Sequence, residues 1–158
     1  MRHLTLLAAS LALLAPVLPP AAHADPAERL VVVESKLGVK ETIDALAREV
    51  EAKGLKIIAR VDHAAGAKAA GMELKPTELL IFGNPKLGTP LIAANPAIGI
   101  DLPLKALAWQ DASGKVMLGY TAPATMKARH GITGQDGAFE TMTKALAGLA
   151  AAATGPAK

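Results

Sequence analysis

Hydrophobic and polar positions recur with two different periods along the chain, and they predict strands mixed with helices. Val39, Ile43, Leu46 and Val50 are spaced by four, three and four residues, so they share one face of a helix that Gly54 ends. A second stripe of the same period predicts a helix from about Asp136 to Ala150, formed by Phe139, Met142, Leu146 and Leu149.

Short β-branched and apolar runs predict five strands, at Leu30–Val33, Leu55–Val61, Glu78–Phe82, Leu104–Gln110 and Val116–Thr121. The Glu78–Phe82 run is apolar at consecutive positions, which predicts burial on both faces. The segment Asp111–Gly114 predicts a hairpin turn between the last two strands. The pattern favours an α/β fold of the α+β type: a two-layer sandwich with a mixed sheet of about five strands and helices mainly on one face.

Three shorter helices are expected between these elements. Asp62 is placed to cap an alanine-rich helix over Ala64–Ala70. Thr89 and Pro90 have the residue types of a helix cap and first turn, so a helix is expected from Pro90 to about Asn95. A further short helix is expected over Pro123–His130.

The N-terminal segment has the pattern of a secretory signal peptide. A short basic start precedes the apolar run Leu4–Leu18, and Ala22-His23-Ala24 offers small residues for cleavage after Ala24. A retained membrane anchor is the alternative, but the run is short and interrupted by prolines. We therefore expect a periplasmic protein with a signal peptide (1–24), a leader and first strand (25–38), one domain (39–150) and a flexible tail (151–158), and no membrane association after cleavage.

Composition excludes several classes of function. Removal of Arg2 with the signal peptide lowers the formal net charge from +3 to +2, without a basic cluster, which argues against nucleic-acid binding. The chain has no cysteine, so disulfides, thiolate metal sites and thiol nucleophiles are excluded. The composition indicates no particular cofactor or oligomeric state.

The loop Gly83–Thr89 is the first candidate for chemistry. It has two glycines at phosphate-loop spacing and a threonine, but the lysine that should follow Gly88 is missing and Pro85 removes a backbone donor. A tight turn before a capped helix is the simplest interpretation. A weaker possibility is an anion site made by backbone N–H groups with Gly83, Asn84, Lys86 and Thr89.

The second set of candidates consists of polar residues at the ends of elements. Asp62 and His63 lie at one strand-to-helix junction, His130 lies at the end of another helix, and Asp101 precedes the fourth strand. These residues could bind a ligand, act as an acid/base pair or hold a metal only if the fold brings distant segments together. Helix caps and local hydrogen bonds are the alternative. Tyr120 either packs on the sheet or lines a pocket.

Several motifs in order resemble the domain of unknown function family number 302. They are Asp62-His63-Ala64, the run Gly71–Pro85, Gly88-Thr89-Pro90-Leu91, Asp101-Leu102-Pro103-Leu104 and Arg129-His130-Gly131. The resemblance covers about residues 39–132 and implies a compact α/β domain without an established activity. It also implies that Asp62, His63, Asn84, Asp101, Tyr120 and His130 are the family's marked polar positions. Members often have Tyr-Asn-x-Pro where this chain has Tyr120-Thr121-Ala122-Pro123.

Three functional hypotheses follow. The first is a binding protein that holds a small ligand or anion in a cleft between the Gly83–Thr89 loop, the Asp101–Pro103 loop and the two histidine junctions. The second is an enzyme that uses Asp62 or Asp101 with His63 or His130 in acid/base or metal-assisted chemistry. The third is a partner-binding module, which should display an exposed apolar patch of several hundred Å² in place of a pocket.

Overall fold

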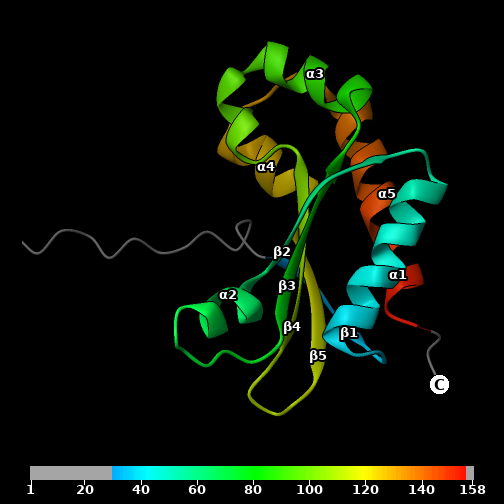
Figure 1. The fold of residues 1–158 in the computed structure, drawn as a ribbon. Helices are drawn as coiled ribbons and strands as arrows, with labels where there is room; N and C mark the ends of the chain where they lie inside the picture. The colour runs from blue at the N-terminus through cyan, green and yellow to red at the C-terminus, as the bar shows by residue number, and fades with distance from the viewer. Residues whose placement is uncertain (1–29, 156–158) are drawn as a thin grey trace, which may run out of the picture.

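The computed structural model describes residues 30–155, so the predicted signal peptide and the last three residues lie outside the described part. Five strands and six helical segments follow one another along this part (Figure 1). Their order is β1 (Leu30–Ser35), α1 (Val39–Ala52), β2 (Lys56–Asp62), α2 (His63–Ala69), β3 (Thr77–Gly83), α3 (Pro85–Ala94), the 3₁₀ helix η2 (Pro96–Ile100), β4 (Leu104–Gln110), β5 (Val116–Thr121), α4 (Pro123–Arg129) and α5 (Asp136–Ala153).

The strands form a single sheet in the order β1-β5-β4-β3-β2, and every pairing is antiparallel. The fold class is therefore confirmed as α+β, but the sheet is antiparallel throughout and not mixed. The helical crossover α1 does give β1 and β2 the same direction. These two strands occupy opposite edges of the sheet, however, so they never pair.

Helices α1 and α5 pack together over one face of the sheet, on the right in Figure 1. The largest fully buried side chains under them include Ile43 and Leu46 of α1, Leu80 and Phe82 of β3, and Leu118 of β5. A second cluster joins α3, η2, α4 and α5, and consists of Leu91, Ile98, Met126, Ile132, Phe139 and Met142. The stripes predicted for α1 and α5 are thus the residues that build the core.

Helix α3 begins five residues earlier than the sequence pattern predicts. Asn84 is its N-cap and accepts a 2.9 Å hydrogen bond from the backbone N–H of Lys86, while Pro85 occupies the first turn. The prediction that Thr89 caps a helix starting at Pro90 is therefore wrong. Both Asn-Pro and Thr-Pro have the pattern of a helix start, and Pro90 is accommodated inside the helix.

The two ends of the described chain meet beside α1. The backbone N–H of Lys36 donates to the carbonyl of Thr154 at 2.9 Å, and the Ser35 and Thr42 hydroxyls lie 2.6 Å apart. Ala153 and Thr154 are buried, so α5 continues past the predicted end at Ala150. These contacts fix β1 and the end of α5 to the same corner of the sandwich.

Candidate functional site

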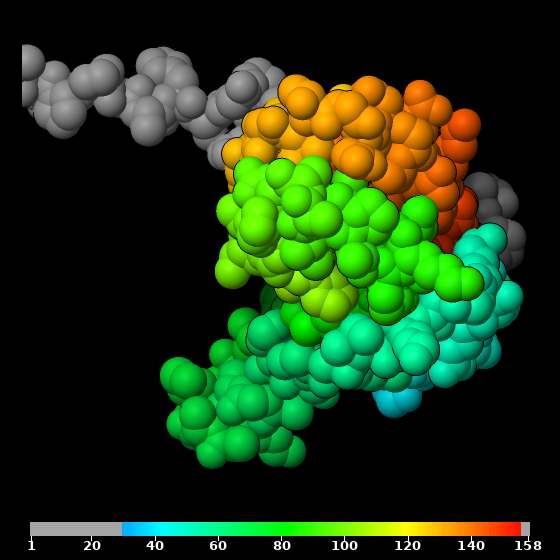
Figure 2. Space-filling model, turned by 90° about the horizontal axis from the view of Figure 1, so that it is seen from above, coloured from blue at the N-terminus to red at the C-terminus, as the bar shows by residue number. Residues whose placement is uncertain are grey.

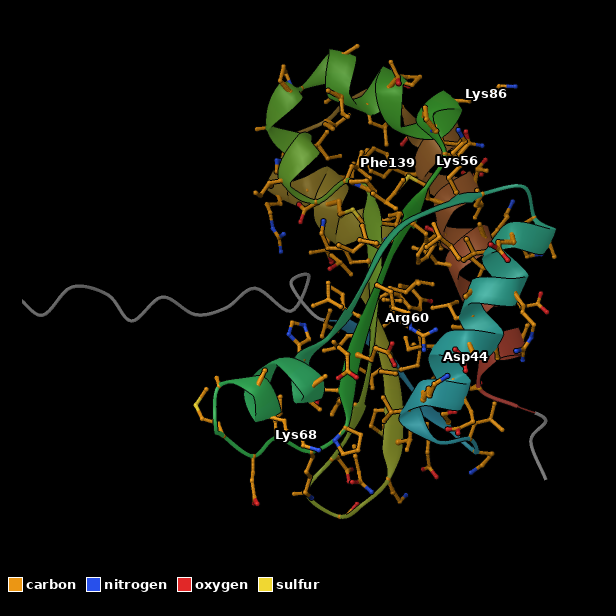
Figure 3. The ribbon with its side chains drawn as sticks, in the orientation of Figure 1. Asp44, Lys56, Arg60, Lys68, Lys86 and Phe139 are labelled. Carbon is orange, nitrogen blue, oxygen red and sulfur yellow. The ribbon has the colours of Figure 1, made fainter. Side chains whose placement is uncertain are left out.

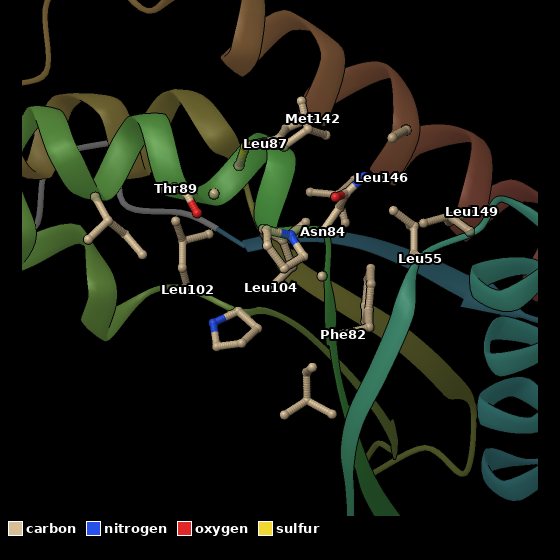
Figure 4. Close-up of a pocket in the computed structure, with 17 residues that line it drawn as sticks. Leu55, Phe82, Asn84, Leu87, Thr89, Leu102, Leu104, Met142, Leu146 and Leu149 are labelled. Atoms are coloured by element: carbon tan, nitrogen blue, oxygen red, sulfur yellow. The ribbon is translucent and has the colours of Figure 1, made fainter.

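A cavity of about 250 Å³ lies between α3, α5 and the ends of β2, β3 and β4 (Figure 4). Its floor includes Phe82 of β3 and Leu104 of β4, and α5 contributes Met142, Leu146 and Leu149. The lining residues are Leu55, Ile58, Phe82, Gly83, Asn84, Pro85, Leu87, Gly88, Thr89, Ile92, Leu102, Pro103, Leu104, Met142, Ala145, Leu146 and Leu149. The lining includes no charged residue, so the cavity is predominantly apolar.

Two polar side chains lie at the cavity, and both come from the segment that the sequence singled out. Asn84 is half-buried, and its amide oxygen is occupied by the cap of α3. Its amide nitrogen stays available as a donor toward the cavity, where Figure 4 places it near Leu146. Thr89, one turn further along α3, is exposed and lies on the side of Leu102. A ligand could therefore bury an apolar body and hydrogen-bond through one polar end.

The two glycines that line the cavity differ in how closely their neighbours approach. A Cβ at Gly83 would lie 3.3 Å from the Cβ of Pro103, so a side chain there would press on the Leu102–Pro103 segment. A Cβ at Gly88 would lie 3.8 Å from a methyl group of Leu102, an ordinary contact distance. Gly83 is therefore explained by packing, whereas Gly88 leaves open space that the cavity uses.

The structure does not support the comparison of Gly83–Thr89 with a phosphate-binding loop. Residues 85–89 belong to α3 and do not form a loop around an anion. The Lys86 side chain points outward, away from the cavity (Figure 3), and Lys86 is not among the lining residues.

Asp101 and His130 are brought together as the sequence analysis required. The His130 Nε2 lies 2.6 Å from Asp101 Oδ2, and Arg129 Nη1 donates to both carboxylate oxygens at 2.9 and 3.1 Å. Asn95 donates from its side-chain amide to the His130 carbonyl at 2.8 Å. The pair therefore joins the end of η2 to the end of α4, beside the cavity but outside its lining.

Asp62 and His63 lie in a different region. Asp62 caps α2 by accepting a 2.8 Å hydrogen bond from the Ala65 N–H, and His63 is exposed. In the strand register, Asp62 of β2 lies opposite Glu78 of β3, which lies opposite Ala108 of β4. Asp101 precedes Leu104, the residue at the other end of β4. Four residues of strand span about 13 Å. The two histidine junctions consequently do not share a cleft.

No group of three or more His, Asp or Glu side chains within residues 30–155 has metal-binding geometry. The sequence hypothesis needed three distant segments to converge, and only Asp101 and His130 meet. Tyr120, another candidate, is buried in the core below α1 and α5, and burial raises the pKa of its phenol above the usual 10.0. It does not line the cavity.

Arg60 forms a charged connection that the sequence analysis missed. It is bonded through Nε to Glu78 on the neighbouring strand and through Nη1 to Asp44 of α1 at 2.5 Å (Figure 3). The hydrogen bond to Glu78 is the main reason that the pKa of Arg60 is raised. Hydrogen bonds from Lys40 and then Arg60 lower the pKa of Asp44. The partners are 16 and 18 residues away from Arg60 in the sequence, so no spacing rule identifies them.

The fold is a two-layer α+β domain with an apolar cavity beside its main core. Residues 31–149 match the family described as "Domain of unknown function DUF302". The chain belongs to this family, which confirms the resemblance found in the sequence.

The matches to individual proteins are of two kinds. A crystal structure of an uncharacterized conserved DUF302 protein from Bacillus stearothermophilus superposes with a TM-score of 0.68 at 20% identity, over 76% of this chain and 94% of the other. Proteins named fluoride-specific ion channel FluC 1 from Brucella suis and Brucella abortus are 52% identical over 103 residues, which is 65% of this chain. The matched part spans only 41% and 38% of those two proteins. Within residues 30–155, none of the helices is long and apolar enough to cross a bilayer.

Proposed function

We propose that the protein binds a small, mostly apolar molecule in the cavity between α3 and α5. The observation that carries the proposal is the apolar lining of a space of about 250 Å³, with Asn84 and Thr89 as its polar side chains. An apolar cavity of about 150 Å³ accommodates benzene. By the same proportion this cavity accommodates about ten carbon atoms, the size of a medium-length acyl or alkyl chain.

The hydrophobic effect supplies the affinity. Each methylene group transferred from water contributes about 0.8 kcal/mol, so a chain of eight carbons offers several kcal/mol before the costs of association. The Asn84 amide nitrogen would orient a hydroxyl, carbonyl or carboxylate at the end of the chain. The ligand-binding hypothesis from the sequence is thus kept, with an apolar ligand in place of an anion.

The test uses 1-octanol as the probe and a cavity-filling variant. We expect saturable ¹⁵N–¹H chemical-shift changes at Leu55, Phe82 and Leu104 when residues 25–158 are titrated with 1-octanol. Gly88→Phe directs a ring toward Leu102 and should abolish these changes. Gly88→Ala is the matched control, because a methyl group at ordinary contact distance leaves the cavity open. Absence of saturation in the wild type, or equal binding by Gly88→Phe, would refute the proposal.

An acid/base enzyme is the second candidate, favoured by the 2.6 Å contact between His130 and Asp101. An oriented histidine beside an apolar cavity suits ester hydrolysis. We expect hydrolysis of p-nitrophenyl octanoate that is lost in His130→Gln if this candidate is correct. If the wild type hydrolyses the ester no faster than buffer does, the enzyme candidate is refuted and ligand binding remains the proposed function.

We also propose that the protein acts in the periplasm. The support is the pattern of residues 1–24, which lie outside the described part of the chain. Intact-mass measurement of protein from a periplasmic extract should give a chain that begins at Asp25. Recovery of the full-length chain from the cytoplasm would contradict this proposal.

A further inference from the structure

The face of the sheet opposite α1 and α5 is apolar, and none of the helices within residues 30–155 lies across it. Strand register places five residues in its middle row, one from each strand: Val32, Gly119, Leu107, Leu79 and Val61. Val32 is 42% exposed and Val61 is 37% exposed, and Leu79 and Leu107 are half-buried. An antiparallel sheet with one face in water ordinarily presents polar residues on that face. The prediction that β3 is buried on both faces therefore fails for the isolated chain, because Leu79 and Ile81 remain partly exposed.

The two flanking rows extend this surface. One row contains Leu30, Thr121, Lys105, Ile81 and Ala59, and the other contains Glu34, Met117, Trp109 and Thr77. The only charged residues of the three rows are Lys105 and Glu34, which have opposite signs and lie in different rows. Lys105 donates to three backbone carbonyls at the end of the sheet, and Glu34 pairs with Lys36 and Lys115. We call these three rows the open face.

Trp109 fills the hollow at the centre of the open face. A Cβ on Gly119 would lie 2.9 Å from Trp109 Cζ3 and 3.5 Å from Val32 Cγ2, so the indole lies across the glycine. This arrangement buries Gly119 and replaces the missing side chain with an aromatic ring. The result is a continuous apolar surface across β1, β5 and β4, suited to packing against another sheet about 10 Å away.

Helix α2 is the second observation, independent of the open face. None of its residues is buried, and the segment that follows exposes Met72 at 62% and Leu74 at 50%. A helix of seven residues has little stability in water without tertiary packing. Figures 1 and 2 show α2 projecting from the rest of the molecule, on the side away from α1 and α5. Within residues 30–155, packing against β3 leaves all the residues of α2 at least partly exposed, so α2 has surface available for a further packing partner.

We propose that the open face is the interface of a symmetric dimer with a second copy of this chain, and that α2 packs against that copy. The open face has no net charge, so it meets an identical surface without the repulsion that a face of one sign would create. Five strands about 4.8 Å apart, with six or seven residues of about 3.3 Å each, give roughly 400–500 Å² in projection. The exposed α2 segment adds to this area, and stable interfaces bury about 800 Å² per partner.

The first test measures the mass of the mature chain in solution. Sedimentation equilibrium of residues 25–158 should give a dimer at micromolar concentration. Leu107→Glu places a charge in the middle row and should raise the dissociation constant at least about a hundredfold, since an unpaired charge is costly to bury. Val32→Glu, at an exposed edge position, should do the same and covers the case that Leu107→Glu folds poorly. Ile100→Glu is the matched control, because Ile100 is 77% exposed and lies outside the open face.

The second test uses Trp109, the single tryptophan of the chain. Dilution through the dissociation range should move its emission to longer wavelength and increase quenching by acrylamide, and Val32→Glu should show the diluted spectrum at every concentration. A wild-type monomer at 100 µM would overturn the proposal, since the face would then belong to another partner. A dimer that survives both glutamate variants would overturn it as well, because the interface would lie elsewhere.

Discussion

Arg60 gives the most informative test of how the layers are held together. Glu78 is buried, with 10% of its side chain exposed, whereas Arg60 and Asp44 are about one-third exposed. Exposed ion pairs contribute about 0–1 kcal/mol, and removing one partner of a buried pair costs about 3–5 kcal/mol. Arg60 joins a buried carboxylate to partly exposed groups, so the cost of losing its contacts should lie between these two values. We therefore expect Arg60→Met to lower the free energy of unfolding by about 2 kcal/mol.

A second substitution separates the loss of the pair from the cost of the remaining charge. Arg60→Met leaves the Glu78 carboxylate buried without its cation, so adding Glu78→Met should restore part of the lost stability. Asp44→Ala removes only the partly exposed contact and should cost less than about 1 kcal/mol. We expect the smallest loss of unfolding free energy for Asp44→Ala, a larger loss for the double variant and the largest loss for Arg60→Met alone.

Urea unfolding followed by circular dichroism measures these free energies, at one fixed protein concentration because dimerisation would add to apparent stability. A double variant that is less stable than Arg60→Met would refute the reasoning, since it would show that the Glu78 charge is not the source of the cost. A loss of less than about 0.5 kcal/mol of unfolding free energy for Arg60→Met would also refute the reasoning. The contact between Arg60 and Glu78 would then contribute no more than an exposed ion pair does.

Two further predictions concern single polar groups. Asn84→Ala should lower the free energy of unfolding by about 1 kcal/mol through loss of the α3 cap, while Asn84→Asp keeps the acceptor and most of the stability, as thermal unfolding would show. Tyr120 is the only tyrosine, so absorbance at 295 nm should give a titration midpoint above 10.0. Because its folded pKa is raised, stability should fall as pH rises from 10.0 through that midpoint. A normal midpoint would contradict the predicted effect of burying this side chain.

The sequence predicts local elements well where a single local rule decides them. The β4–β5 hairpin has the expected bounds because alternation and the Asp111–Gly114 turn agree. The predicted start of α3 is wrong because two cap-and-proline pairs compete within seven residues, and local rules do not choose between them. Strand order is also beyond local pattern, since the partner of β1 is the most distant strand in the chain.

The candidate site was predictable only in part. Gly83, Asn84 and Thr89 line the cavity, but most of the lining consists of apolar residues from separate segments that read as ordinary core residues. The sequence groups Asp62, His63, Asp101 and His130 because all four lie at the ends of elements, and the structure brings only Asp101 and His130 into contact. A single sequence does not show which ends share an edge of the sheet.

The position of β1 has a consequence for the synthesis of the chain. This strand is the first element of the described chain, yet its hydrogen-bonding partner β5 does not begin until Val116. At about 5–20 residues per second, β1 waits several seconds on the ribosome without a partner. Its Val31-Val32-Val33 run is meanwhile a ready template for association with other unfinished chains. Protection of this segment by a chaperone is therefore most valuable before residue 121 has emerged.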